Sequence, residues 1–183
     1  MLFLKNSVFL HGMRVAVLSF KLCRKLKLNA KRTFYIFLGA VLHDIGKFKI
    51  DKAILNKPDS LNEEEFKIIK THVNVKLRWI KNSIVKNIIL YHHENIDGTG
   101  YKGLTYIPYE AKIVRICDIF DALTHDRVYH KKVNVFEALK IMIGEINKLD
   151  YLIMDSFIRM ILCNKSYKCN YSSCLKKSLN NAR

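Results

Sequence analysis

Proline and glycine are scarce in this chain, with two prolines and seven glycines among 183 residues. The sequence therefore lacks the frequent turn residues that separate the many short strands of a sandwich or barrel. Stretches rich in Ile, Leu and Lys take their place, and half of all residues are hydrophobic. This composition predicts an all-α protein, and the length suits a single domain that can bury a proper core.

Acidic residues are also few, because 16 Asp and Glu stand against 32 Lys and Arg, which gives a formal net charge of +16. One interpretation is an electrostatic field that attracts a polyanion such as a nucleotide or nucleic acid. The simpler interpretation, which suits most of the lysines, is a compositional bias spread over solvated helix faces. A nucleic-acid partner is not expected, since the sequence carries no helix-turn-helix and no aromatic-basic surface motif.

The five cysteines have no CxxC spacing, and their odd number does not favour a disulfide framework. Cys23 and Cys117 lie in apolar helical stretches and are predicted to be buried thiols. The spacing of Cys163, Cys169 and Cys174 does not support a metal site.

A long apolar run that could cross a membrane is missing as well. The apolar N-terminus is interrupted by Lys5 and Asn6 and has no small-residue cleavage site. We therefore expect a cytoplasmic protein with no membrane partner.

The spacing of apolar residues predicts a series of helices. In the first, His11 shares one buried stripe with Val15 and Leu22. Asn62 and Glu65 resemble a capping box, and three glycines predict a loop over residues 94–109. The predicted helices cover about residues 8–28, 30–45, 62–80, 83–93, 110–124, 134–147 and 150–163.

Histidines and carboxylates gather at the ends and on the stripes of these helices, in an orderly pattern. The residues are His11, His43, Asp44, His72, His92, His93 and Asp118. Taken alone, His11 is more typical of a packed core histidine and His72 of a solvated side chain. Together, imidazoles and carboxylates suit Fe, Mn, Zn or Ni more than Ca or Mg. A carboxylate such as Asp44 can bridge two cations.

Two longer motifs carry a resemblance to a known family. The run HDIGK at 43–47 resembles the signature of HD-domain phosphohydrolases, and HHENIDGTGY at 92–101 is similar to the HHExxDGxGYP signature of the HD-GYP family. The similarity continues at 11–16, 54–58 and 118–127, and covers about residues 8 to 160. The resemblance implies a single HD-domain helical bundle over residues 1–163, and we expect residues 164–183 to form a flexible basic tail.

The resemblance also implies a dinuclear centre and the roles of its residues. The first of two divalent ions, with Fe or Mn favoured and Zn or Ni as alternatives, would be held by His11, His43, Asp44 and Asp118. The second would be held by His72, His92 and His93, with Asp44 bridging both. Lys47 would lie beside the scissile phosphate, and Arg127 would contact the phosphate or guanine of the ligand. Asp121 would orient the metal-binding side chains without binding a metal itself.

Several positions depart from the family pattern and put substrate fit in doubt more than metal binding. Lys102 replaces the signature proline, Asn95 stands where Arg or Lys is common, and Val128 and His130 replace a proline and a basic residue. Ser7 lies where some members use Glu for a third metal, so we expect a two-metal site.

The family resemblance implies a phosphodiesterase that hydrolyses cyclic di-GMP to linear pGpG, or further to GMP. Its partners would be the cyclic dinucleotide and a regulatory or diguanylate cyclase (GGDEF) protein. Two alternatives stay open: an HD-domain phosphohydrolase of another cyclic dinucleotide or nucleotide, and a catalytically weak signalling or binding module.

Overall fold

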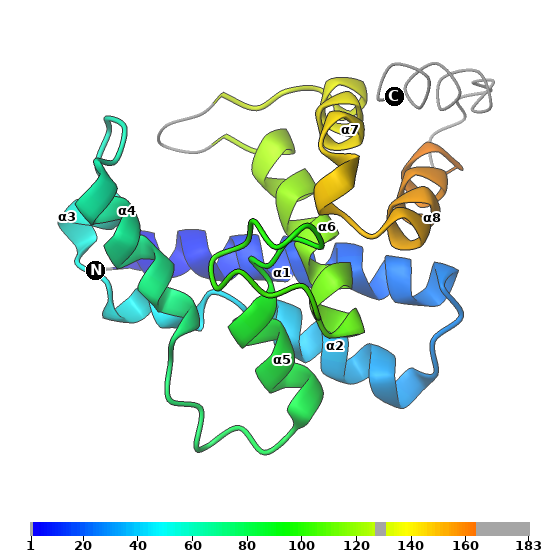
Figure 1. The fold of residues 1–183 in the computed structure, drawn as a ribbon, viewed down its shortest axis with the longest axis horizontal. Helices are drawn as coiled ribbons and strands as arrows, with labels where there is room; N and C mark the ends of the chain where they lie inside the picture. The colour runs from blue at the N-terminus through cyan, green and yellow to red at the C-terminus, as the bar shows by residue number, and fades with distance from the viewer. Residues whose placement is uncertain (1, 127–130, 164–183) are drawn as a thin grey trace.

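The computed structural model describes residues 2–126 and 131–163, with side chains for 8–126 and 131–162. Every regular element within these ranges is helical (Figure 1), which confirms the predicted all-α class. The α-helices are α1 (Leu2–Lys25), α2 (Ala30–Leu42), α3 (Lys52–Leu55), α4 (Glu63–Lys70), α5 (Ser83–Tyr91), α6 (Tyr109–Thr124), α7 (Val135–Gly144) and α8 (Tyr151–Cys163). The short 3₁₀ turns are η1 (Ile45–Lys49), η2 (Thr71–Val73) and η3 (Ile146–Lys148).

Helices α1 and α2 form an antiparallel pair (Figure 1). Their backbones approach closely at Gly12, where a Cβ atom would lie 2.6 Å from the carbonyl oxygen of Val41. Val15, Leu22 and Ile36 are fully buried between them and the rest of the core. The pair thereby brings the first turns of α1 and the last turn of α2 to the same region.

Helix α6 is the central element and packs against α1, α5, α7 and α8. Most of its residues are buried, and Phe120 packs edge-on against Phe157 of α8 with ring centroids 5.1 Å apart. Cys23 and Cys117 are buried free thiols, as predicted. Because α6 is buried on most sides, a polar residue on it must find partners inside the protein.

The predicted helix over 62–80 is wrong in its second half. Its start is confirmed, since Asn62 and Glu65 form the expected capping box, but α4 ends at Lys70 and residues 74–82 form no helix. Leu77 and Ile80 are nevertheless buried, in a small cluster with Val85 and Ile89 of α5. The tertiary contacts of an irregular segment therefore replace the expected helix here.

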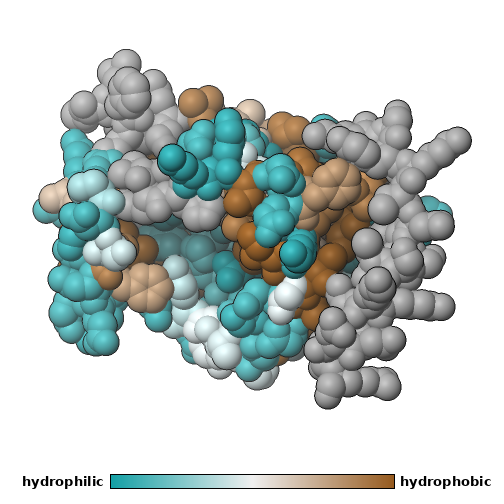
Figure 2. Space-filling view, turned by 90° about the horizontal axis from the view of Figure 1, so that it is seen from above, coloured by the Kyte–Doolittle hydropathy of each residue, from teal (hydrophilic) through white to brown (hydrophobic). Residues whose placement is uncertain are grey.

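The surface seen from above α7 is uneven in polarity (Figure 2). Hydrophobic side chains gather on the half of this face where α7 and α8 lie, and the half over α3 and α4 is mainly hydrophilic. Within the described ranges, no helix combines the length and apolarity that a membrane crossing needs.

Candidate metal centre

Five elements of the bundle bring the predicted ligands to one place. His11 comes from α1, His43 and Asp44 follow α2, and His72 lies in η2. The remaining ligands come from the end of α5 and from α6: His92, His93 and Asp118. The atoms that could hold a metal cluster in two groups, Asp44 with His72, His92 and His93, and Asp44 with His11 and His43. Asp44 belongs to both groups.

The two oxygens of Asp44 face different histidines. Oδ2 lies 3.4 Å from His43 Nε2 and 3.8 Å from His11 Nε2. Oδ1 lies 3.4 Å from His72 Nε2 and 3.8 Å from His92 Nε2. The side chain of Asp44 is 4% exposed, so it is a buried carboxylate flanked on both sides by imidazole nitrogens.

Close packing of the backbone holds these groups together. Gly46 lies just past Asp44, and a Cβ atom there would be 1.9 Å from the carbonyl oxygen of His72. Only glycine fits at this contact, which joins η1 to η2. Gly46 therefore allows η1, which follows Asp44, to approach η2, which carries His72.

Three histidines are oriented by main-chain carbonyls. The Nδ1–H of His43 donates to Ala40 O at 2.6 Å, that of His72 to Ile69 O at 2.7 Å, and that of His92 to Ile88 O at 3.0 Å. With the proton fixed on Nδ1, the lone pair of each Nε2 is free to bind a metal. His43 Nε2 and Asp44 Oδ1 are buried without any hydrogen-bond partner. This donor set fits a divalent ion.

His11 is oriented by carboxylates. Its Nδ1 donates to Asp121 Oδ2 at 2.6 Å, and its Nε2 lies 3.0 Å from Asp118 Oδ1. Burial lowers the pKa of His11, but the hydrogen bonds to Asp118 and Asp121 outweigh it and raise the pKa to about 9. Asp121 is itself held by Arg14, whose Nε and Nη2 donate to its two oxygens at 2.8 and 3.0 Å.

Burial and charge set the other ligands in the states that bind metals. Burial would raise the pKa of Asp44, but Lys47 and then His43 hold it well below its usual range. Burial lowers the pKa of His72 to about 4 and also lowers the pKa of His92. At neutral pH these groups are an ionised carboxylate and neutral imidazoles, and neither has to lose a proton before it binds a cation.

Lys47 lies inside the centre. Its Nζ donates to Asp44 Oδ2 at 2.7 Å, and its side chain is 21% exposed. The ammonium group therefore neutralises Asp44 from the more open side of the site.

His93 is paired differently from the other histidines. Its Nδ1 lies 3.2 Å from Nη1 of Arg115, and its ring stacks on Tyr101 with centroids 4.3 Å apart. The loop that follows is tied back by Glu94, whose carboxylate accepts from the backbone N–H of Lys102 and Leu104. The sequence patterns gave no role to Arg14, Arg115 or Glu94. Each of them nevertheless lies within one helical turn of a predicted site residue.

Three predictions concern parts of the chain that the structure does not describe. Arg127 and the predicted tail over residues 164–183 are outside the described residues, and so is the side chain of Ser7. The ligand contact of Arg127 and the absence of a third metal remain predictions.

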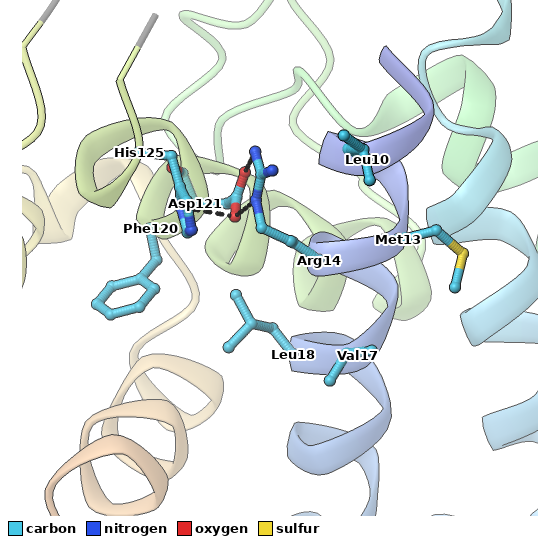
Figure 3. Close-up of a pocket in the computed structure, with 8 residues that line it drawn as sticks. All are labelled: Leu10, Met13, Arg14, Val17, Leu18, Phe120, Asp121 and His125. Atoms are coloured by element: carbon cyan, nitrogen blue, oxygen red, sulfur yellow. Dashed lines mark hydrogen bonds and ion pairs between the residues drawn. The ribbon is translucent and has the colours of Figure 1, made fainter. Parts of the chain in front are cut away.

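An apolar pocket of about 380 Å³ lies between α1 and the end of α6, and Asp121, the hydrogen-bond partner of His11, is among its lining residues. Figure 3 shows Asp121 and Arg14 paired at its edge, beside Phe120 of α6 and His125, which follows α6. Leu10, Met13, Val17 and Leu18 of α1 also line it.

Comparison with known families decides the assignment. A family model described as HD domain matches residues 1–151. The chain belongs to the HD domain family. HD domain proteins bind divalent metals, and the buried histidine and aspartate cluster could hold them.

Relatives confirm the predicted HD-GYP branch of this family. The chain is 34% identical to the cyclic di-GMP phosphodiesterase PA4108 of Pseudomonas aeruginosa, over 84% of this chain and 39% of that protein. It is 32% identical to 3'3'-cGAMP-specific phosphodiesterase 1 of Vibrio cholerae, over 82% of this chain and 37% of that protein. Among solved structures, Bd1817, an HDG"Y"P protein from Bdellovibrio bacteriovorus, matches with a TM-score of 0.69 and 29% identity, over 84% of this chain and 52% of that one. The chain spans about two fifths of the length of the two curated relatives.

Proposed function

We propose that this HD domain is a phosphodiesterase that hydrolyses cyclic di-GMP to linear pGpG with two divalent metal ions. The observation that carries the proposal is Asp44, whose two oxygens face two separate sets of imidazole nitrogens at 3.4 to 3.8 Å. A carboxylate in this position can bridge two cations and hold them a few ångströms apart.

The ligands divide between two metal positions. His11, His43 and Asp118 would hold the first ion, and His72, His92 and His93 the second, with Asp44 shared between them. The mixture of nitrogen and oxygen donors favours Fe or Mn, with Zn or Ni as alternatives. When bound, the ions would supply Lewis acidity for phosphodiester hydrolysis.

The side chains around the ligands have separate tasks. Asp121 accepts from Nδ1 of His11 and keeps the Nε2 of that ring turned toward Asp118. Lys47 has its ammonium group 2.7 Å from Asp44, where it could approach a phosphate oxygen and stabilise negative charge. Arg127 would contact the dinucleotide from outside the described residues.

The choice of substrate is supported by the relatives and by charge. PA4108 is named a cyclic di-GMP phosphodiesterase, and a formal net charge of +16 favours an anionic ligand. We also propose that the protein works in the cytoplasm and that a GGDEF protein is a partner, which its chemistry would suit because such proteins make cyclic di-GMP.

A second candidate substrate is another cyclic dinucleotide, and the loop after His93 favours it. Asn95 and Lys102 depart from the family signature. Both side chains tie this loop to other elements, Asn95 to Arg115 of α6 and Lys102 to Val73 O of η2. A relative at 32% identity is named as specific for 3'3'-cGAMP. Changed side chains beside the centre are where such a preference would arise.

The test is turnover of matched nucleotides by protein that has been stripped of metal and reloaded with Mn²⁺ or Fe²⁺ without oxygen. Cyclic di-GMP, 3'3'-cGAMP and cyclic di-AMP would each be incubated, and the products separated by chromatography. We expect pGpG from cyclic di-GMP, and slow formation of GMP. Faster turnover of another dinucleotide would favour the second candidate.

The control variants are Asp44→Asn, which should abolish both metal binding and turnover, and Glu64→Gln on the exposed face of α4, which should change neither. A wild-type protein that holds two metals and hydrolyses none of the three nucleotides would overturn the proposal and leave a binding module.

A further inference from the structure

The hydrogen bonds of His93 point to a tautomer unlike that of its neighbours. In His43, His72 and His92 the Nδ1–H donates to a main-chain carbonyl. At His93 the partner of Nδ1 is Nη1 of Arg115, 3.2 Å away. A guanidinium group can only donate, so this Nδ1 must accept, and the neutral ring carries its proton on Nε2.

The guanidinium group is held in this position from a second side. Nη2 of Arg115 donates to Oδ1 of Asn95 at 3.1 Å, and Nδ2 of Asn95 donates to the hydroxyl of Thr99 at 3.0 Å. Asn95 is 7% exposed, and Arg115 lies one helical turn before Asp118 on the buried helix α6. The ring of Tyr101 stacks on the His93 ring and is nearly parallel to it, at 19°. We call Arg115 and Asn95 the clamp.

We propose that the clamp withholds His93 from the second metal position, so that the two positions differ in affinity. For Nε2 of His93 to bind a cation, the ring proton must move to Nδ1, and the bond from Arg115 must break. The other histidines meet no such barrier, because their protons already lie on Nδ1. This inference rests on the proposed dinuclear centre, but it concerns the order and strength of metal binding and not the nucleotide.

The clamp also explains why an asparagine, and not a basic residue, suits position 95. An arginine or lysine at position 95 would place two cationic side chains together beside Arg115, whereas the amide oxygen of Asn95 accepts from it. Arg115 is therefore a positioning residue, which acts on the centre through His93.

The first measurement is the tautomer of His93 in metal-free protein, read from long-range proton–nitrogen NMR spectra of the imidazole rings. We expect Nε2–H at His93, and Nδ1–H at His43, His72 and His92. In Arg115→Met, which keeps the length of the side chain and removes its donors, we expect the His93 proton to shift toward Nδ1.

The second measurement is calorimetric titration of metal-free protein with Mn²⁺ alone. Wild-type protein should show a tight and a weaker step. Arg115→Met should tighten the weaker step by about tenfold, the size expected when one hydrogen bond no longer has to break on metal binding, and leave the tight step unchanged. The matched control is Arg159→Met, which removes a guanidinium paired with Asp155 on α8 and should change neither step.

Three results would overturn the inference. The first is an Nδ1–H tautomer at His93 in the wild-type protein, and the second is an Arg115→Met variant whose weaker step is unchanged or weakened further. The third is equal tightening of both steps in that variant, which would indicate only the loss of a nearby positive charge. A protein that hydrolyses no nucleotide would still give the His93 tautomer and the Mn²⁺ titration steps. The clamp and the proposed activity can therefore be refuted independently.

Discussion

Asp121→Asn is the substitution whose effect follows most fully from the structure. The carboxylate of Asp121 is completely buried, and its oxygens accept from Nδ1 of His11 and from Nε and Nη2 of Arg14 at 2.6, 2.8 and 3.0 Å. An asparagine has the same shape but one acceptor oxygen. Whichever donor this oxygen serves, the amide NH₂ then faces the other donor.

The expected loss of stability in Asp121→Asn can be estimated from these contacts. A hydrogen bond to a charged group contributes about 1.5–3 kcal/mol, and a buried unpaired group costs a similar amount. Arg14 is 39% exposed and can turn partly to water, which limits the penalty. We therefore expect the free energy of unfolding of metal-free Asp121→Asn to fall by about 2–3 kcal/mol, with first-metal affinity reduced roughly 10- to 100-fold.

The assay combines urea unfolding of metal-free protein at neutral pH with Mn²⁺ calorimetry. Glu64→Gln is the control, since its exposed pair with Lys67 should contribute less than about 0.5 kcal/mol. Wild-type stability together with wild-type metal affinity in Asp121→Asn would refute the reasoning, because it would mean that His11 needs no carboxylate to hold its orientation.

Three further outcomes are expected. Lys47→Ala should keep near-normal metal content and lose about a hundredfold in hydrolysis rate, measured at saturating nucleotide; an unchanged rate would remove Lys47 from the mechanism. Gly46→Ala should lose about 3 kcal/mol of stability in urea unfolding, because its Cβ would meet the His72 carbonyl; Gly144→Ala, with open space around it, is the neutral control. Finally, the free energy of unfolding of metal-free protein should fall by roughly 3 kcal/mol as pH rises from 6.5 to 9. Folding raises the pKa of His11, so protonated His11 stabilises the fold fully only below the pKa of the unfolded chain, and this stabilisation is lost as pH approaches 9. Urea unfolding across this range checks it, and His11→Gln should remove this part of the pH dependence; an equally steep loss in that variant would assign it to other groups.

Local features of the sequence predicted most helices well. Asn62 with Glu65 marked the start of α4, and the glycine-rich stretch after His93 forms the expected loop. These signals are visible because a cap or a turn depends on residues a few positions apart. The end of α4 was missed, since burial of Leu77 and Ile80 in an irregular segment depends on contacts with α5.

The motifs predicted which histidines and carboxylates lie together, but not the protonation state of each side chain. The pattern of histidines does not tell which ring nitrogen carries the proton, because that depends on carbonyls such as Ala40 O and on distant side chains such as Arg115. Arg115 is 22 positions from His93 in sequence and stands in no motif. The close contact of Gly46 with η2 likewise needed the fold.

The most direct test of the dinuclear centre is an electron paramagnetic resonance spectrum of protein loaded with excess Mn²⁺ and then freed of unbound metal. If Asp44 bridges two ions, the spectrum should be that of exchange-coupled Mn²⁺, and Asp44→Asn should lose the coupled signal. A spectrum of isolated Mn²⁺ ions in the wild-type protein that persists at saturating Mn²⁺ would contradict the account.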